Sequence, residues 1–203
     1  MRINRLLLSL ALLTISAVSQ QSVPSPPADT ASLADTMKFL QDQLNAVGSV
    51  HYAEHWHDYV DDTDGVTQHS FEQSNVAADP ASCWIKYHLK IVAGAGLNDR
   101  DNGFFLPDVQ DLVVTTGEQY ANRHYVASGY PNVSAKVDPP VFWLVARRPD
   151  DMSRLSLWRR AGENAFVFTD EDTANRVAKA MLHAVQLCGG AKVSETVLNG
   201  AGK

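Results

Sequence analysis

Apolar residues recur every three or four positions near both ends of the chain, which is the spacing of one face of a helix. The first such stripe predicts a helix over residues 33–47, preceded by a capping-box pattern at Ser32–Asp35. The second predicts a helix over residues 170–188, which starts with the capping-box pattern Thr169–Asp172 and its three acidic residues. A glycine follows each stripe, as is typical of helix C-termini.

The sequence between these helices has a different pattern. Short runs of aromatic and β-branched residues alternate with clusters of turn residues, which predicts strands joined by hairpins. The pair Asn102-Gly103 is the strongest signal for a tight turn, and residues 117–140 are less regular. We therefore expect one α+β domain over residues 32–190, built from a strongly bent antiparallel sheet or partial barrel of about seven strands, with an N-terminal and a C-terminal helix.

The late strands suggest a resemblance at the level of the superfold. The segments RLSLWRR and AFVFT run directly into the helix over residues 170–188, and this order is similar to that of the pleckstrin-homology-like superfold. The alternative is a lipocalin-like barrel, which also has about eight strands and a late helix. The early Gly-x-Trp signature of lipocalins is missing, because Gly48-Ser49-Val50 stands in that position.

The first residues predict export. Residues 1–19 combine early arginines, a short apolar run and a small-x-small triplet, which is the pattern of a cleaved secretory signal peptide. The apolar run is too short to span a bilayer comfortably. Residues 20–31 predict a disordered lead-in and residues 191–203 a loose tail. The expected location is the periplasm or the extracellular medium.

Charge limits the range of partners. The whole chain has a formal net charge of −6, and removal of Arg2 and Arg5 with the signal peptide would bring it to −8. An acidic chain without a basic run does not attract phosphate backbones, so nucleic acid is not an expected partner. We expect an unidentified protein or small-molecule ligand, no cofactor, and no transmembrane segment after cleavage.

Two cysteines, Cys83 and Cys188, are present in this exported chain. Export favours a disulfide, and each cysteine shares a strand or helix face with apolar residues, so both point toward a core where they could meet. The alternative is a pair of buried free thiols that pack as small hydrophobes.

The sequence HYAEHWH contains the candidate metal ligands His51, His55 and His57. In a strand these three imidazoles share one face. A transition-metal site needs three or four ligands, and His69 or Glu72 on the next strand could supply another. The simpler interpretation leaves the three histidines in solvent.

Motifs for catalysis are missing from the sequence. Neither a Gly-x-Ser-x-Gly elbow nor a His-Glu-x-x-His helix occurs. The arginine pairs 147–148 and 159–160 could form a basic patch, although neutralisation of nearby acids is the simpler role. We therefore expect an exported, non-enzymatic binding or interaction domain. The alternative is a small metal-binding protein or metalloenzyme that uses the histidine cluster.

Overall fold

The computed structural model describes residues 30–148, 155–156, 159–160 and 163–190. In chain order the described elements are α1 (Leu33–Ala46), β1 (Ser49–Asp58), β2 (Thr63–Asp79), β3 (Trp84–Ala93), β4 (Gly96–Phe105), the 3-10 helix η1 (Leu106–Asp108), β5 (Asp111–Thr116), α2 (Gly117–Ala127), β6 (Val133–Asp138), β7 (Phe142–Arg147), β8 (Leu155–Ser156), β9 (Arg159–Arg160), β10 (Glu163–Phe168) and α3 (Glu171–Leu187). The predicted α+β class and both terminal helices are confirmed.

The strands form two open antiparallel sheets, of five and of three strands. The first has the order β4-β3-β2-β1-β6 and the second the order β10-β7-β5, while β8 pairs with β9. The five-stranded sheet is not closed, because its edge strands β4 and β6 do not pair with each other, and β5, β7 and β10 form a separate sheet. The predicted single bent sheet is thus divided in two, and the lipocalin-like barrel is wrong.

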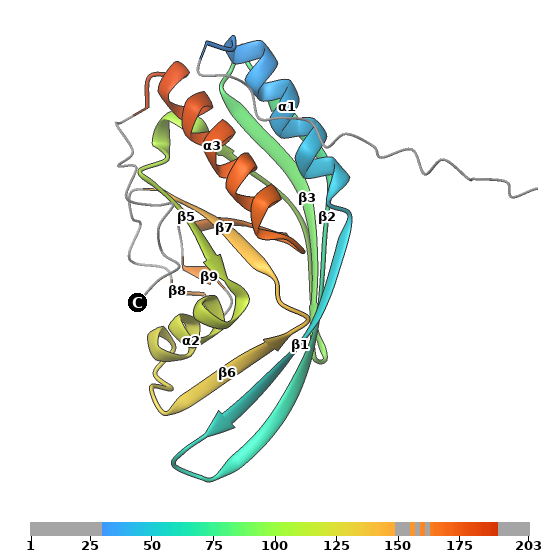
Figure 1. The fold of residues 1–203 in the computed structure, drawn as a ribbon, viewed down its shortest axis with the longest axis vertical. Helices are drawn as coiled ribbons and strands as arrows, with labels where there is room; N and C mark the ends of the chain where they lie inside the picture. The colour runs from blue at the N-terminus through green and yellow to red at the C-terminus, as the bar shows by residue number, and fades with distance from the viewer. Residues whose placement is uncertain (1–29, 149–154, 157–158, 161–162, 191–203) are drawn as a thin grey trace, which may run out of the picture.

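Strands β1 and β2 form a long hairpin that extends well below the rest of the five-stranded sheet (Figure 1). Farther along β2 the pairing with β3 shifts register between Ser74 and Ala77, where Asn75 has a φ of 53°. The side chain of Asn45 on α1 accepts from the N–H of Val76 and donates to its C=O, each at 2.9 Å. This pair of bonds satisfies the backbone at the irregularity and fixes α1 to the sheet.

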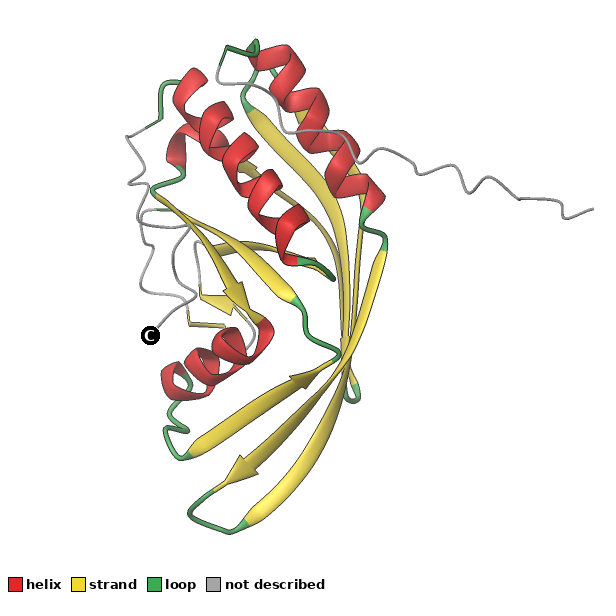
Figure 2. Ribbon diagram, viewed as in Figure 1, coloured by secondary structure: helices red, strands yellow, loops and turns green. Residues whose placement is uncertain are grey.

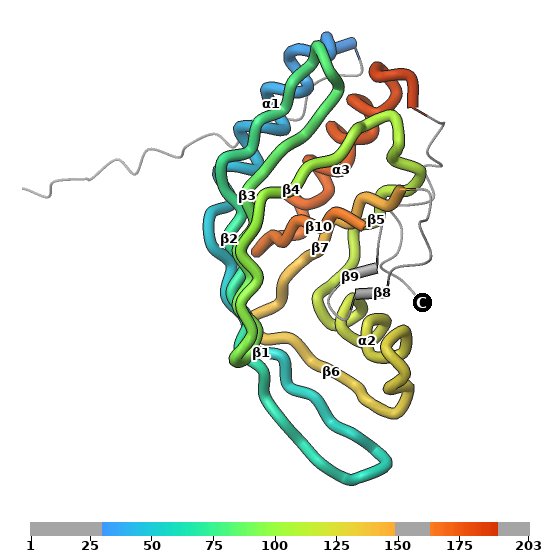
Figure 3. Tube along the Cα trace, turned by 180° about the vertical axis from the view of Figure 1, so that it is seen from behind, coloured from blue at the N-terminus to red at the C-terminus, as the bar shows by residue number. Residues whose placement is uncertain are grey.

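The helices lie on one face of the five-stranded sheet. Figure 2 shows α1 and α3 side by side over its upper half and α2 near its lower half. The view from behind shows β2, β3 and β4 with these helices on their far side (Figure 3). Among the described residues, therefore, no helix covers the opposite face of this sheet, which we call the outer face.

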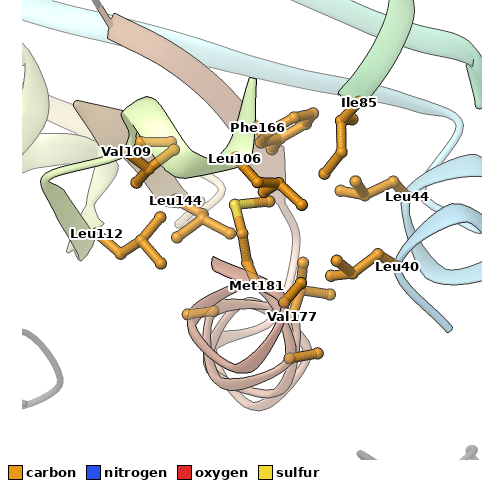
Figure 4. Packing of buried hydrophobic residues seen from close by; sticks show 14 of the residues in the cluster. Leu40, Leu44, Ile85, Leu106, Val109, Leu112, Leu144, Phe166, Val177 and Met181 are labelled. Atoms are coloured by element: carbon orange, nitrogen blue, oxygen red, sulfur yellow. The ribbon is translucent and has the colours of Figure 1, made fainter. Parts of the chain in front are cut away.

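The main core lies between α1, α3 and the inner faces of both sheets. Figure 4 shows Leu40 and Leu44 from α1 and Met181 from α3 converging on Ile85 and Phe166. All five side chains are fully buried. Burial of a side chain of this size contributes about 1.5–3 kcal/mol to stability, so this layer makes the largest contribution to stability among the described contacts.

The predicted disulfide is confirmed. Cys83, just before β3, is bonded to Cys188, which ends α3, and their Cα atoms are 6.0 Å apart. Both residues are partly buried against the main core. The bond closes a loop across 105 positions of sequence and thereby attaches the last helix to the five-stranded sheet.

Two predictions about local structure were wrong. The Asn102-Gly103 pair lies inside β4, where Gly103 pairs with Lys86, and the β3–β4 turn instead begins at Gly94, with a φ of 55°. A Cβ atom at position 103 would lie 3.0 Å from the carbonyl oxygen of Ile85, so this glycine serves a close approach of strands. The second error is α2, which the sequence pattern did not predict.

Several predictions lie wholly or mainly outside the described residues. They are the signal peptide over residues 1–19, most of the lead-in over residues 20–31 and the tail over residues 191–203. Among the residues that the structure describes, no helix is both long and apolar enough to span a membrane.

Candidate functional site

The three candidate metal ligands lie on the outer face of β1, as the strand alternation predicts. His51 and His55 are exposed. His57 is partly buried, because its ring packs edge-on against Tyr59 with centroids 4.4 Å apart. Its Nδ1 atom lies 3.0 Å from Oδ1 of Asp64, the residue directly opposite on β2. An acidic side chain, and not a further imidazole, is thus the neighbour of His57.

The neighbouring strand does not bring His69 to these histidines. His69 pairs with Tyr52, so its side chain lies on the inner face, whereas Glu72 pairs with Ser49 on the outer face. Within the described part of the chain, no three His, Cys, Asp or Glu side chains are grouped so that they could hold a metal ion. Of the two residues that could have supplied a further ligand, Glu72 lies on the same face as the three histidines and His69 does not.

A fourth histidine of the outer face, His88 on β3, lies between two carboxylates of β4. Its Nδ1 is 2.9 Å from Asp101 and its Nε2 is 2.8 Å from Asp99. The hydrogen bond to Asp101, together with the charge of Asp99, raises the pKa of His88 above its usual value, although partial desolvation opposes the shift. Because the carboxylates occupy opposite sides of the ring, they stabilise an imidazolium and do not converge on one point.

One member of the first arginine pair, Arg147, has a structural role. Arg147 at the end of β7 contacts Asp111 at 3.0 Å and Glu163 at 3.2 Å, one from each flanking strand. This confirms that Arg147 neutralises nearby acids. The side chains of Arg159 and Arg160 lie outside the described part of the structure.

At the inner face of the long hairpin lies a partly buried polar group of three residues, Glu54, His69 and Tyr125, which we call the Glu54 cluster. Tyr125 on α2 donates a hydrogen bond of 2.6 Å to Oε1 of Glu54. Nε2 of His69 lies 3.5 Å from Oε2 of Glu54, too far for a strong hydrogen bond, so this contact is mainly electrostatic. The His69 ring stacks on Tyr52 with centroids 4.7 Å apart. The cluster thus joins β1, β2 and α2.

Glu54 is ionised in this environment. Burial by itself raises the pKa of its carboxyl group, but the contacts with His69 and Tyr125 outweigh burial and lower the pKa below its usual value. The charge of His124 acts in the same direction. Burial and the adjacent carboxylate raise the pKa of Tyr125, so its hydroxyl keeps the proton that it donates.

Two further contacts attach α2 to the sheets. Tyr120 stacks on Trp143 of β7, with ring centroids 4.0 Å apart and planes 6° from parallel. Asn122 donates to the C=O of Ala135 on β6 at 3.2 Å and accepts from its N–H at 2.7 Å. Together with the Glu54 cluster, these contacts hold α2 at successive points along its length.

Helix α2, held in this position, brings two chain segments next to each other. We call this region the distal end and define it as residues 58–66, at the β1–β2 turn, and residues 126–134, between α2 and β6. The N–H of Tyr59 donates to the C=O of Asn132 at 3.1 Å, and Oγ of Ser134 donates to the Tyr59 hydroxyl at 3.3 Å. In Figure 1 both turns lie at the lower end of the molecule.

The distal end is where exposed apolar side chains gather. The described residues include eight large apolar side chains that are exposed, and five of them belong to the distal end. Each of these five is more than half exposed. They are Tyr59, Val60, Val66, Val126 and Tyr130. Because large apolar groups that cluster on a surface are typical of interaction sites, this region is the strongest candidate for a functional site.

The distal end is also acidic. Residues 58–66 contain four aspartates and no lysine or arginine, and residues 126–134 contain no charged side chain. The side chains of Asp62 and Asp64 are 98% and 85% exposed. The apolar groups are thus combined with negative charge, which a partner of the same sign would not approach.

Comparisons with known proteins gave no match. No protein-family model matches the chain, and the searches of curated proteins and of solved structures found no match. The resemblance to the pleckstrin-homology-like superfold therefore stays a prediction.

The sequence pattern did not indicate the distal end. The aspartates after β1 are typical of an ordinary turn, and no sequence spacing places Asn132 and Ser134 beside Tyr59. One signal was present: Thr116 and Gln119 have the spacing of a capping box, and the structure forms that box at the start of α2. With that helix recognised, its tyrosines could have been considered as partners of the inner face of the hairpin.

Proposed function

We propose that this protein is an exported, non-enzymatic binding or interaction domain that engages its partner with the distal end. The observation that carries the proposal is the concentration of five exposed, large apolar side chains in two neighbouring segments, residues 58–66 and 126–134. Exposing such groups to water is unfavourable, and a folded protein that exposes them together usually covers them in a complex.

The way in which the distal end is held supports the proposal. The Glu54 cluster and the Asn122–Ala135 bonds fix α2 against β1 and β6. On the hairpin itself, the Trp56 ring lies so close over Gly65 that a Cβ atom at position 65 would overlap it. A surface that is already ordered loses less conformational entropy on binding, so these contacts favour recognition.

The chemistry of the two cysteines supports export. The Cys83–Cys188 disulfide is of a kind that persists in oxidising compartments and is rare in the cytosol. It agrees with the secretory pattern of residues 1–19. The proposal thus assigns the protein to the cell envelope or the medium, where an acidic domain with an apolar end could meet another exported protein.

Site-specific photo-crosslinking in the exporting host tests the proposed function. A benzophenone amino acid would replace Tyr59 or Tyr130 in one set of variants, and Leu97 or Leu187 in a control set. The control positions are also large, apolar and exposed, but they lie on β4 and at the end of α3. We expect a discrete adduct from both distal positions and none from the control positions. Equal adducts from both sets, or none from the distal set, would contradict the proposal.

A further inference from the structure

We infer that the partner of the distal end is a cationic protein segment that carries apolar side chains of its own. This inference rests on the proposed function and adds the chemistry of the partner. It is argued from charge complementarity: the surface that exposes the apolar groups has four carboxylates within nine residues and no lysine or arginine in either of its two segments.

The carboxylates differ in how far they are already engaged. Oδ1 of Asp58 accepts from the N–H of Val60 at 2.9 Å and so stabilises the turn. Asp64 contacts His57 at 3.0 Å, and His57 also lies 4.0 Å from Asp62. Since a neutral imidazole brings no compensating charge, Asp61, Asp62 and Asp64 leave the turn negative when His57 is unprotonated.

The basic side chains of neighbouring elements are fewer than the aspartates of the distal end. Lys136 on β6 pairs with His55, as Val66 does, so it lies on the outer face beside one of the five apolar side chains. Arg123 on α2 lies over the ring of Tyr120, 5.6 Å from its centroid, and Tyr120 itself stacks on Trp143 in the interior. The four aspartates outnumber Lys136, so the charge around the exposed apolar side chains is net negative.

This combination selects among classes of partner. Phosphate backbones and anionic lipid surfaces carry the same sign of charge and would be repelled. An apolar partner without charge would gain nothing from the aspartates. A segment with lysine or arginine beside apolar residues satisfies both features, because apolar contacts form the centre of such an interface and ion pairs form its rim.

Three short synthetic peptides of equal length provide the probe for the mature protein. The first alternates lysine with leucine and tryptophan, the second replaces each lysine with glutamate, and the third keeps the lysines but replaces the apolar residues with serine. Binding is followed by fluorescence anisotropy at low and at high ionic strength. We expect the first peptide to bind most tightly and to weaken as salt is added. Equal binding of the glutamate peptide, or of zwitterionic lipid vesicles in its place, would overturn the inference.

A matched pair of variants locates the effect on the protein. The distal variant combines Asp61→Asn with Asp62→Asn, and asparagine also tolerates the positive φ of Asp62. The control variant combines Glu72→Gln with Asp108→Asn, which are exposed acids elsewhere, so both variants lose the same net charge. We expect binding of the lysine peptide to weaken about fivefold in the distal variant and less than about twofold in the control. An equal loss in both variants would mean that net charge alone attracts the peptide, and the inference would fail.

The two proposals fail separately. If the benzophenone at Tyr59 captures a partner whose contacting segment is neutral or acidic, the inference about charge is wrong while the proposed function stands. If the distal positions yield no adduct at all, the proposed function fails, and the peptide result then reports an attraction without a role in the host.

Discussion

The half of the molecule under α1 and α3 and the half that carries α2 are held together by different means. Helix α3 buries seven side chains against the sheets, whereas α2 buries two small residues, Gly117 and Ala121. The first half also contains the disulfide. The second half depends on a smaller apolar cluster around Trp143, a ring stack, side-chain hydrogen bonds and one partly buried carboxylate. Stability is thus concentrated in one half, and the exposed apolar surface is presented by the other.

This division has a physical reason. A surface that must expose apolar groups cannot bury the same groups in a core, so its shape has to come from directional contacts. Hydrogen bonds contribute about 0.5–1.5 kcal/mol each, less than the burial of a large side chain, but they fix geometry closely. We therefore expect substitutions in the half under α1 and α3 to change mainly stability, and substitutions at the distal end to change mainly binding.

The largest effect is expected for Phe166→Ala. Phe166 is fully buried and contacts the rings of Tyr87 and Phe104. Removal of its ring should lower the free energy of unfolding by about 3–5 kcal/mol. Denaturant unfolding measures this change, and Leu97→Ala, at an exposed position, should change stability by less than about 0.5 kcal/mol. Similar effects at both positions would contradict the proposed location of the core.

The next effect is expected for loss of the disulfide. The double variant Cys83→Ala, Cys188→Ala should lower the free energy of unfolding by about 2–4 kcal/mol, because the unfolded chain gains freedom when the long loop is opened. The measurement compares this variant with the native protein in denaturant. A reducing agent should destabilise the native protein by a similar amount and leave the variant unchanged. If the reducing agent has no effect, the two sulfurs are not bonded in solution.

The half under α1 and α3 was predicted well from the sequence. Both terminal helices end within about a residue of the predicted ranges 33–47 and 170–188, because their apolar stripes face a core and follow helical spacing closely. The partnership of Cys83 and Cys188 followed from the same reasoning. In this half, the apolar positions of the sequence are the positions that become buried, so their spacing is enough to predict the helices.

The other half could not be predicted to the same extent. Helix α2 buries little, so its sequence has no apolar stripe to mark it. The register that places His69 opposite Tyr52, and not beside His55, depends on where the β1–β2 turn falls. A shift of one residue would have reversed the face of every side chain on that strand. The Glu54 cluster joins positions 71 residues apart, a distance over which sequence spacing contains no information.

A smaller effect is expected for Tyr125→Phe. The variant removes the hydroxyl that donates to Glu54 and leaves a half-buried carboxylate with one fewer donor, which should cost about 1–3 kcal/mol. Amide hydrogen exchange should accelerate in α2 more than in α3, because the lost hydrogen bond attaches α2, and not α3, to the sheet. Tyr130→Phe, at an exposed position, is the control and should leave exchange unchanged. Equal acceleration in both helices would show that the loss is global.

The same cluster predicts a dependence on pH. The pKa of Glu54 is lower in the folded protein than its usual value of 4.5. The contribution of its carboxylate to stability is therefore fully present above the usual value and is lost as pH falls through the lowered pKa. Unfolding measured across this acid range should show a shallower loss of stability in Glu54→Gln than in the native protein. An unchanged slope would mean that other carboxylates account for the acid sensitivity.

The smallest effect on stability, and the largest on recognition, is expected for the double variant Tyr59→Ser, Tyr130→Ser. Both rings are more than half exposed, so the free energy of unfolding should change by no more than about 0.5 kcal/mol. Because aromatic side chains supply much of the energy of interfaces, binding of the lysine–leucine–tryptophan peptide should nevertheless be lost or weakened at least about tenfold. The double variant Leu97→Ser, Leu187→Ser removes as many exposed apolar groups elsewhere and should bind normally. A large loss of stability in the tyrosine variant would instead mean that the distal end is part of the structural core, and the contrast between the two halves would not hold.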